Sequence, residues 1–228
     1  MKLTRRKVLV LALIVCILSM LSAGSLAWFH YTDSVKNVFM VTDSDSNGTP
    51  DFSMALWETG EDGQPTKEKE YKNLLPGAVL DKDPTVENTG NYDQYVRAYV
   101  TFSDASALQA ACEKYGLPED LRSWLNVDLT AWTADDAVRV DAAADTITYT
   151  YYLNRVLKKT DGTETDLQQL FTKVSVPGEF VQEDLSGGAT VFRIDVDAEA
   201  LQVENITANN AKEAFSFVGW DAFETYGE

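Results

Sequence analysis

The chain has little cysteine and almost no histidine, and each shortage excludes a class of protein. It contains 2 cysteines and 1 histidine among 228 residues. Cys16 lies in the apolar N-terminal segment, so Cys112 has no intrachain disulfide partner once that segment is removed. A zinc hydrolase needs several histidines or thiolates at fixed spacing, and a Ser-His-Asp or Cys-His site would have to recruit His30 from near the mature N-terminus. The sequence therefore predicts none of these enzymes.

Catalytic sequence motifs are also missing. No GxSxG, Walker or dinucleotide-binding glycine pattern occurs. A pair of carboxylates is enough for a glycosidase, but no pair is singled out in a chain this acidic. We therefore expect a protein that is not an enzyme.

Positive charge is scarce as well. Four basic residues and no acidic residue precede position 28, so the rest of the chain has 15 basic against 36 acidic residues, a formal net charge of −21. Such a surface repels nucleic acids and anionic polymers, and it concentrates cations such as Ca²⁺. Nucleic-acid binding is excluded, and the acidity also serves to keep an exported protein soluble.

The N-terminus has the three parts of a secretory signal. A basic start is followed by an apolar run over 8–21 and by the small-residue stretch SAGSLA at 22–27. This order predicts a signal helix in residues 1–27, cleaved between Ala27 and Trp28. The alternative is an uncleaved anchor, because Trp28 and Phe29 lengthen the apolar stretch. Both interpretations place residues 28–228 outside the cell.

The mature part has the pattern of an all-β protein. Apolar and polar residues alternate, or Val, Ile, Thr and Tyr predominate, between turn signals such as Pro76-Gly77 and Asp161-Gly162. The expected strands cover 51–58, 79–86, 95–102, 125–132, 146–153, 172–176 and 191–196. Helical spacing predicts an insertion at 104–124, with Asp104 as its N-cap, and a short helix at 210–218. We expect a single β-sandwich domain over 28–228.

One loop has the spacing of a calcium site. The sequence DSDSNGTPD at 43–51 places oxygen ligands at alternate positions beside a glycine, as in D-x-D-x-[DN]-G loops. Where those loops supply a bidentate Glu, Met54 stands here, so a further carboxylate is required. The expected ligands of Ca²⁺ are Asp43, Asp45, Asn47 and Asp51. The alternative is a polar turn, since these residue types also favour turns.

Aromatic residues are plentiful in the expected strands. At strand spacing they favour core packing and cross-strand pairs, and a sugar-stacking face is the alternative. The residues concerned are Tyr92, Tyr95, Tyr99, Trp124, Trp132, Tyr149, Tyr151 and Tyr152.

Several sequence stretches together resemble one family. GSLAWF at 24–29 is similar to the G-T-x-A-aromatic-F junction cleaved by SipW-type signal peptidases. LPGAVLDKDPTVENTG at 75–90 and DQYVR at 93–97 resemble L-x-P-G-x-x-x-x-K-D-P-x-V-x-N-x-G and D-x-Y-V-R. YYLNRVL at 151–157, LFTKV at 170–174 and AEALQ at 198–202 are similar to its later motifs. These stretches span most of the chain, and they resemble the TasA/camelysin family of proteins exported by Gram-positive bacteria.

The resemblance implies a jelly-roll β-sandwich and a structural role as a biofilm-matrix fibre subunit. Fibres of this kind form with copies of the chain or a paralogue by donor-strand exchange, and the matching donor segment here is 28–41. Its apolar residues are Phe29, Tyr31, Val35, Val38 and Phe39. The segments 43–51 and 104–124 depart from the family pattern as insertions. The family also includes a metalloendopeptidase label, for which this chain has no zinc motif. A calcium-dependent or carbohydrate-binding adhesion module is the other alternative.

Overall fold

The computed structural model describes most of the chain after residue 51. It covers 52–67, 69, 75–160, 165–181, 184 and 192–218, together with the backbone of 30–34 and 37–38. Within these ranges no helix is long and apolar enough to cross a membrane. The expected signal helix over 1–27 lies outside the described residues.

The described residues form mainly strands, which confirms the expectation of an all-β fold. The strands are β1 (His30–Ser34), β2 (Asn37–Val38), β3 (Met54–Thr59), β4 (Pro65–Thr66), β5 (Val79–Asp81), β6 (Thr85–Asn88), β7 (Gln94–Ser103), β8 (Trp132–Asp141), β9 (Thr146–Leu153), β10 (Leu167–Gln169), β11 (Lys173–Ser175) and β12 (Ile194–Gln202). The helices are α2 (Ala105–Tyr115), the 3₁₀ helix η1 (Leu121–Trp124) and α4 (Ala211–Phe217).

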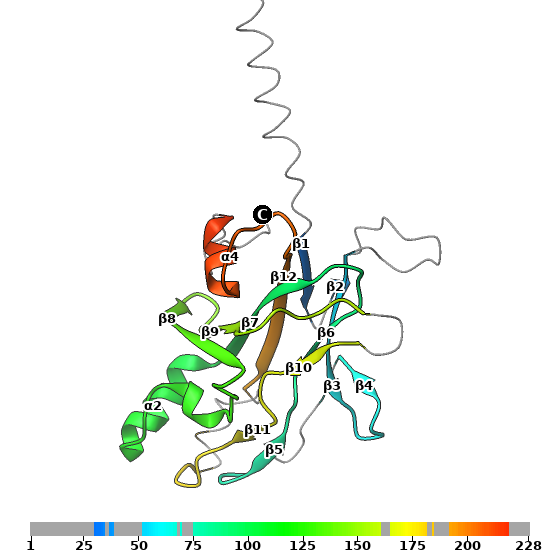
Figure 1. The fold of residues 1–228 in the computed structure, drawn as a ribbon. Helices are drawn as coiled ribbons and strands as arrows, with labels where there is room; N and C mark the ends of the chain where they lie inside the picture. Colours follow the sequence, from blue (N-terminus) through cyan, green and yellow to red (C-terminus); the bar gives the residue numbers. More distant parts are fainter. Residues whose placement is uncertain are drawn as a thin grey trace, which may run out of the picture.

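The strands form three sheets with antiparallel pairings (Figure 1). The largest has six strands in the order β2-β1-β12-β7-β9-β8. A four-stranded sheet has the order β10-β6-β3-β4, and β11 pairs with β5. The strands β1 and β12 are far apart in sequence but adjacent in the sheet, so the N-terminal strand is placed by a strand near the C-terminus.

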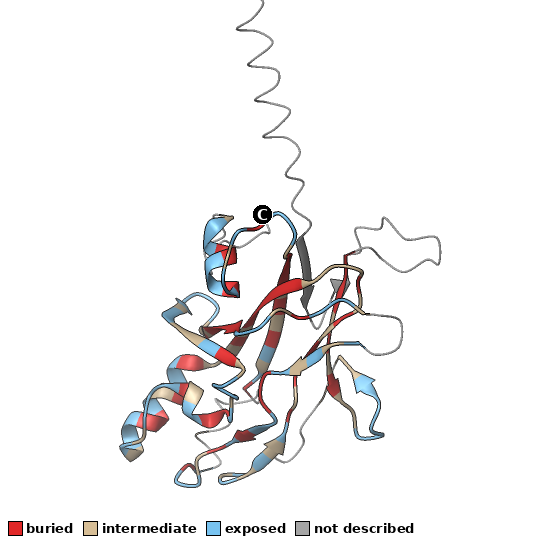
Figure 2. Cartoon of the chain, in the orientation of Figure 1, coloured by how far each residue is buried: buried red, intermediate tan, exposed pale blue. Residues whose placement is uncertain are grey.

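The hydrophobic core lies where the sheets face one another. In β7, alternate residues are buried in this core because side chains of a strand point to opposite faces. Figure 2 shows buried residues running along the central strands. The core joins residues of the sheets, including Met54, Leu56, Val86, Val96, Val100, Phe102, Tyr149, Val174 and Val196. Packing, the favoured role of the strand aromatics, is confirmed for Tyr95, Trp124, Trp132, Tyr149, Tyr151 and Tyr152.

One expected strand is wrong, and another is divided. Leu125 makes only an isolated bridge with Val174, and the chain turns over 129–131, where the Asp128 carboxylate accepts hydrogen bonds from Thr130 N and Thr130 Oγ1. The strand begins at Trp132 and continues to Asp141, beyond the expected range. The expected strand at 79–86 is divided into β5 and β6 around Pro84, a residue without an N–H to donate to a ladder.

The helical insertion is confirmed as α2 and η1, with the break after Gly116. The expected capping by Asp104 is wrong. Asp104 has a left-handed backbone (φ 53°) and its side chain accepts no capping hydrogen bond. The carboxylate of Asp145 instead accepts bonds from Ser106 N and Ser106 Oγ, at 3.0 and 2.9 Å. The cap comes from the β8–β9 turn, 39 residues further along the chain. The short C-terminal helix is confirmed as α4, and its Asn210 side chain accepts from Glu213 N.

Candidate functional site at the edge of the six-stranded sheet

The N-terminal strand β1 lies along β12, antiparallel to it. The register runs from His30 opposite Leu201 to Ser34 opposite Asp197. On its other side β1 pairs with β2, in which Asn37 lies opposite Ser34. Among the described strands, β1 therefore hydrogen-bonds only to β12 and to the short β2 beside it.

The strand β12 presents small, buried residues to the core next to β1. Val196, Ala198 and Ala200 are buried, while the intervening Asp195, Asp197 and Glu199 lie on the other face. β1 also contacts β3 of the four-stranded sheet. It thus lies where the two sheets approach one another, beside the end of the core.

An ion pair between the buried Arg97 and the partly buried Glu199 holds β12 to β7. Arg97 Nε donates to Glu199 Oε2 at 2.5 Å, and the two residues are directly opposite in the ladder. The Tyr99 hydroxyl donates to the same oxygen at 2.8 Å. Burial, and then the charge of Glu199, raise the pKa of Tyr99, so this hydroxyl keeps its proton throughout the physiological range. Glu199 is also the register partner of Thr32 in β1. The ion pair between Arg97 and Glu199 therefore lies next to β1.

The helix α4 covers this ion pair from outside. The Arg97 guanidinium lies over the Phe215 ring, 4.1 Å from its centroid. Tyr152 packs against the same ring, and Lys212 Nζ contacts Asp135 Oδ1 at 3.2 Å. The arginine is therefore enclosed by one carboxylate and aromatic rings, the environment in which a buried guanidinium is stabilised.

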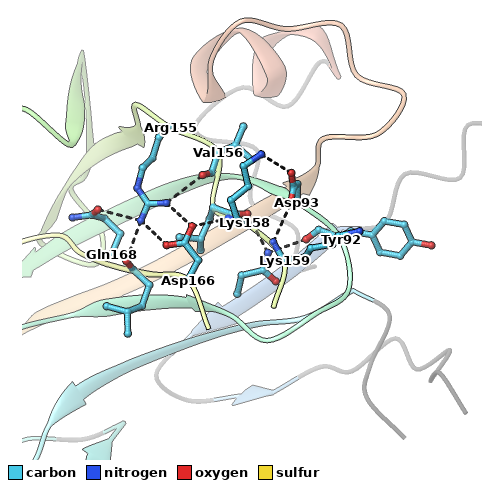
Figure 3. Close-up of polar contacts among 11 residues, drawn as sticks. Tyr92, Asp93, Arg155, Val156, Lys158, Lys159, Asp166 and Gln168 are labelled. Carbon is cyan, nitrogen blue, oxygen red and sulfur yellow. Dashed lines mark hydrogen bonds and ion pairs between the residues drawn. The ribbon is translucent and has the colours of Figure 1, made fainter. Parts of the chain in front are cut away.

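A polar network joins the ends of β7, β9 and β12 (Figure 3). The Asp93 carboxylate accepts from Lys158 Nζ at 2.7 Å and from Lys159 N at 2.9 Å. The backbone oxygen of Asp93 accepts from Val203 N at 2.9 Å. These bonds fix the end of β12 where β1 begins.

A bidentate pair extends the same network. Arg155 donates from Nη1 and Nη2 to the two carboxylate oxygens of Asp166, at 2.6 and 2.9 Å. Asp166 also accepts from Lys158 N at 2.8 Å. Burial alone would raise the pKa of Asp166, but these hydrogen bonds hold it below its usual value. In Figure 3 the two carboxylates lie on either side of the segment that follows β9.

Few of the site residues expected from the sequence fall within the described residues. Tyr31 lies in β1 and Val38 in β2. The cleavage residues Ala27 and Trp28, the donor residues Phe29, Val35 and Phe39, and the calcium ligands Asp43, Asp45, Asn47 and Asp51 lie outside them. In the part of the chain that the structure covers, no group of three or more His, Cys, Asp or Glu side chains is placed to hold a metal ion.

The ion pairs of Lys82 and Arg97 were not predicted. Lys82 Nζ contacts Glu58 Oε1, and both residues are buried. Lys82, Arg97 and Glu199 lie in the stretches on which the sequence resemblance rests, but those stretches do not predict what the three residues contact. Their partners become visible only from the register, which brings Arg97 and Glu199 together across 102 residues. Comparison with protein-family models, curated proteins and solved structures gives no match for this chain.

Proposed function

We propose that residues 28–228 form an exported structural subunit of the Gram-positive cell surface or extracellular matrix. Its copies would join, to one another or to a paralogue, by exchanging β1 in a jelly-roll-like sandwich. The sequence supports export through its signal at 1–27 and its SipW-type junction. A structural role agrees with the lack of catalytic motifs.

The position of β1 is the observation that carries this proposal. β1 is an N-terminal strand second from the edge of the sheet, and among the described strands its ladder partners are β12 and the two-residue outer strand β2. The β1 of a second copy can make the same pairing with β12, so exchange preserves the hydrogen bonds. Because donor and acceptor are different surfaces, the contact is heterologous and continues into a filament.

An engineered disulfide tests the exchange directly. Ser34→Cys and Asp197→Cys introduce thiols at opposed positions, whose Cα separation in either kind of antiparallel pair suits a disulfide. The chain is residues 28–228 with Cys112→Ala, which removes the remaining native thiol. Oxidised at low concentration, it should give intrachain crosslinks. Oxidised after assembly, it should give an interchain ladder on a non-reducing gel.

Each single-cysteine variant serves as the control, because it can form dimers but no ladder. Electron microscopy of the same samples shows whether the ladder accompanies filaments. Intrachain crosslinks alone at every concentration, together with a monomer in size exclusion, would contradict the proposal.

A further inference from the structure

The six-stranded sheet has a second edge, formed by β8. This strand is the last in the order, and among the described strands it pairs only with β9. Figure 1 shows β8 and β1 at opposite sides of the sheet. The proposed exchange of β1 therefore leaves the β8 edge unchanged.

Only the last part of β8 is a regular edge. The register shifts between Ala134 and Val138, which marks a bulge that interrupts pairing in the first half. From Val138 opposite Tyr149 to Asp141 opposite Thr146 the ladder is regular. Among the described residues, no backbone hydrogen bond outside the ladder involves 138–141. This short segment therefore presents unpaired backbone groups on its outer side.

The same segment exposes apolar side chains. Val140 is 66 % exposed and Val138 is 37 % exposed, although their ladder partners Ile147 and Tyr149 are buried. Edge strands are usually protected by charges or bulges against pairing with another chain. Here the bulge protects the first half of β8 and leaves 138–141 open.

The sequence Val138-Arg139-Val140-Asp141 is self-complementary in an antiparallel pair. If two copies pair about Val140, Arg139 of each copy lies opposite Asp141 of the other. Two opposite-charge pairs then flank a valine pair, and directly opposed charges of this kind stabilise a ladder. A shift by one residue places Arg139 opposite Val140 and loses both pairs.

We propose that residues 139–141 of β8 pair with the same residues of a second copy, antiparallel and centred on Val140. The contact is isologous, so it closes after two chains. It requires only the folded chain. Its consequence, that pairs of fibres join side by side, rests on the proposed function. So short a contact is weak between monomers and becomes effective when many copies are arrayed along two fibres.

A thiol at the twofold position tests the pairing in the unassembled chain. Val140→Cys is introduced into residues 28–228 with Cys112→Ala, and Leu129→Cys is the matched control because Leu129 is equally exposed at 66 %. Opposed residues of an antiparallel pair are close enough for a disulfide. On oxidation the Val140→Cys dimer should form about tenfold faster than the control dimer, through local concentration. Equal rates would overturn the proposal.

Charge exchange identifies the register. Arg139→Glu faces Asp141 of the second copy, and Asp141→Lys faces Arg139, so each variant should lose the rate advantage of Val140→Cys. Mixing the two variants restores opposite charges at both positions, and heterodimers should form at the original rate. Asp141 also accepts bonds from Ala143 N and Ala144 N, so melting temperatures are compared. Two folded variants whose mixture gives no heterodimer would contradict the pairing.

Fibre bundling provides the second measurement. If fibres form, Arg139→Glu should leave their length unchanged and separate bundles into single fibres in electron micrographs. Arg193→Glu, an exposed arginine outside β8, is the control and should leave bundles intact. Bundles that persist in Arg139→Glu would overturn the side-by-side role. Absence of fibres would count against the proposed function and leave the thiol experiment to decide the β8 pairing.

Discussion

Among single residues, Lys82 is a buried cation with one buried acidic partner. Its ammonium contacts Glu58 Oε1 in a buried site, and among the described residues Glu58 Oε2 has no hydrogen-bond partner. A buried pair of this kind is held in place because either charge alone would be very unfavourable, although the pair itself adds little stability over apolar packing. Its role is therefore to specify how β3 meets the segment after β5.

A double-mutant cycle tests this role. Lys82→Met leaves Glu58 as an unpaired buried acid and should lower the free energy of unfolding by about 3–5 kcal/mol. The double variant Lys82→Met/Glu58→Met removes both charges and should recover most of this loss. Urea unfolding followed by tryptophan fluorescence measures each variant. A double variant as unstable as the single one would show that the ion pair itself is required.

Asp166 gives a prediction for acid stability. Its pKa is lowered in the folded chain, so its contribution is complete above the unfolded value of about 3.9 and is lost as the pH falls through the folded value. Asp166→Asn should reduce stability by about 1 kcal/mol at neutral pH, because the bonds to Arg155 are partly exposed. Thermal melts between pH 7 and pH 2 should show a smaller loss for this variant than for the parent chain. Asp195→Asn, at an exposed position, is the control and should change neither the stability at neutral pH nor the loss of stability on acidification.

Sequence patterns predicted which residues are important better than they predicted which residues touch. The alternation of apolar and polar residues identified the buried face of β7. The motif resemblance included Arg97, Lys82 and Glu199. Each of these has a partner far away in sequence, and a partner depends on strand register, which local patterns do not determine. The cap of α2 shows the same limit, because Asp145 reaches Ser106 from a different turn.

Among the elements, strands with continuous alternation were predicted and strands with local interruptions were not. The expected strands at 95–102 and 146–153 match β7 and β9 closely. β8 was placed too early, because its exposed, charged residues and its bulge hide the alternation. The position of β1 in the sheet could not be predicted either, because its neighbour β12 is far away in the sequence.

Removing β1 tests the candidate site at the level of the element. A chain that begins at residue 39 should remain folded but less stable, because the edge of β12 and the adjacent core are uncovered. A synthetic peptide of residues 28–38 should raise its melting temperature in a concentration-dependent manner, since it binds only the folded state. The same peptide with Thr32→Pro is the control, because proline cannot donate to the ladder. Equal effects of both peptides would mean that the strand is not recognised through its backbone.

For the whole molecule, net charge opposes assembly while individual contacts favour it. Residues 28–228 have a formal net charge of −21, so two copies repel each other at a distance. The two proposed contacts respond differently to salt. Strand exchange depends on backbone hydrogen bonds and apolar burial, whereas the β8 pairing depends partly on the ion pairs of Arg139 with Asp141. Ionic strength therefore separates the two contacts in one experiment.

Fibre growth should accelerate as salt is added. Raising the ionic strength from 0.01 M to 0.15 M shortens the screening length from about 30 Å to about 8 Å, which removes most of the repulsion between copies. The rate of growth, followed by light scattering, should increase about tenfold or more. The difference in bundling between the parent chain and Arg139→Glu should decrease over the same range, because the opposed charges are screened too. A growth rate that falls with salt would show that attraction between charged groups, and not strand exchange, drives assembly.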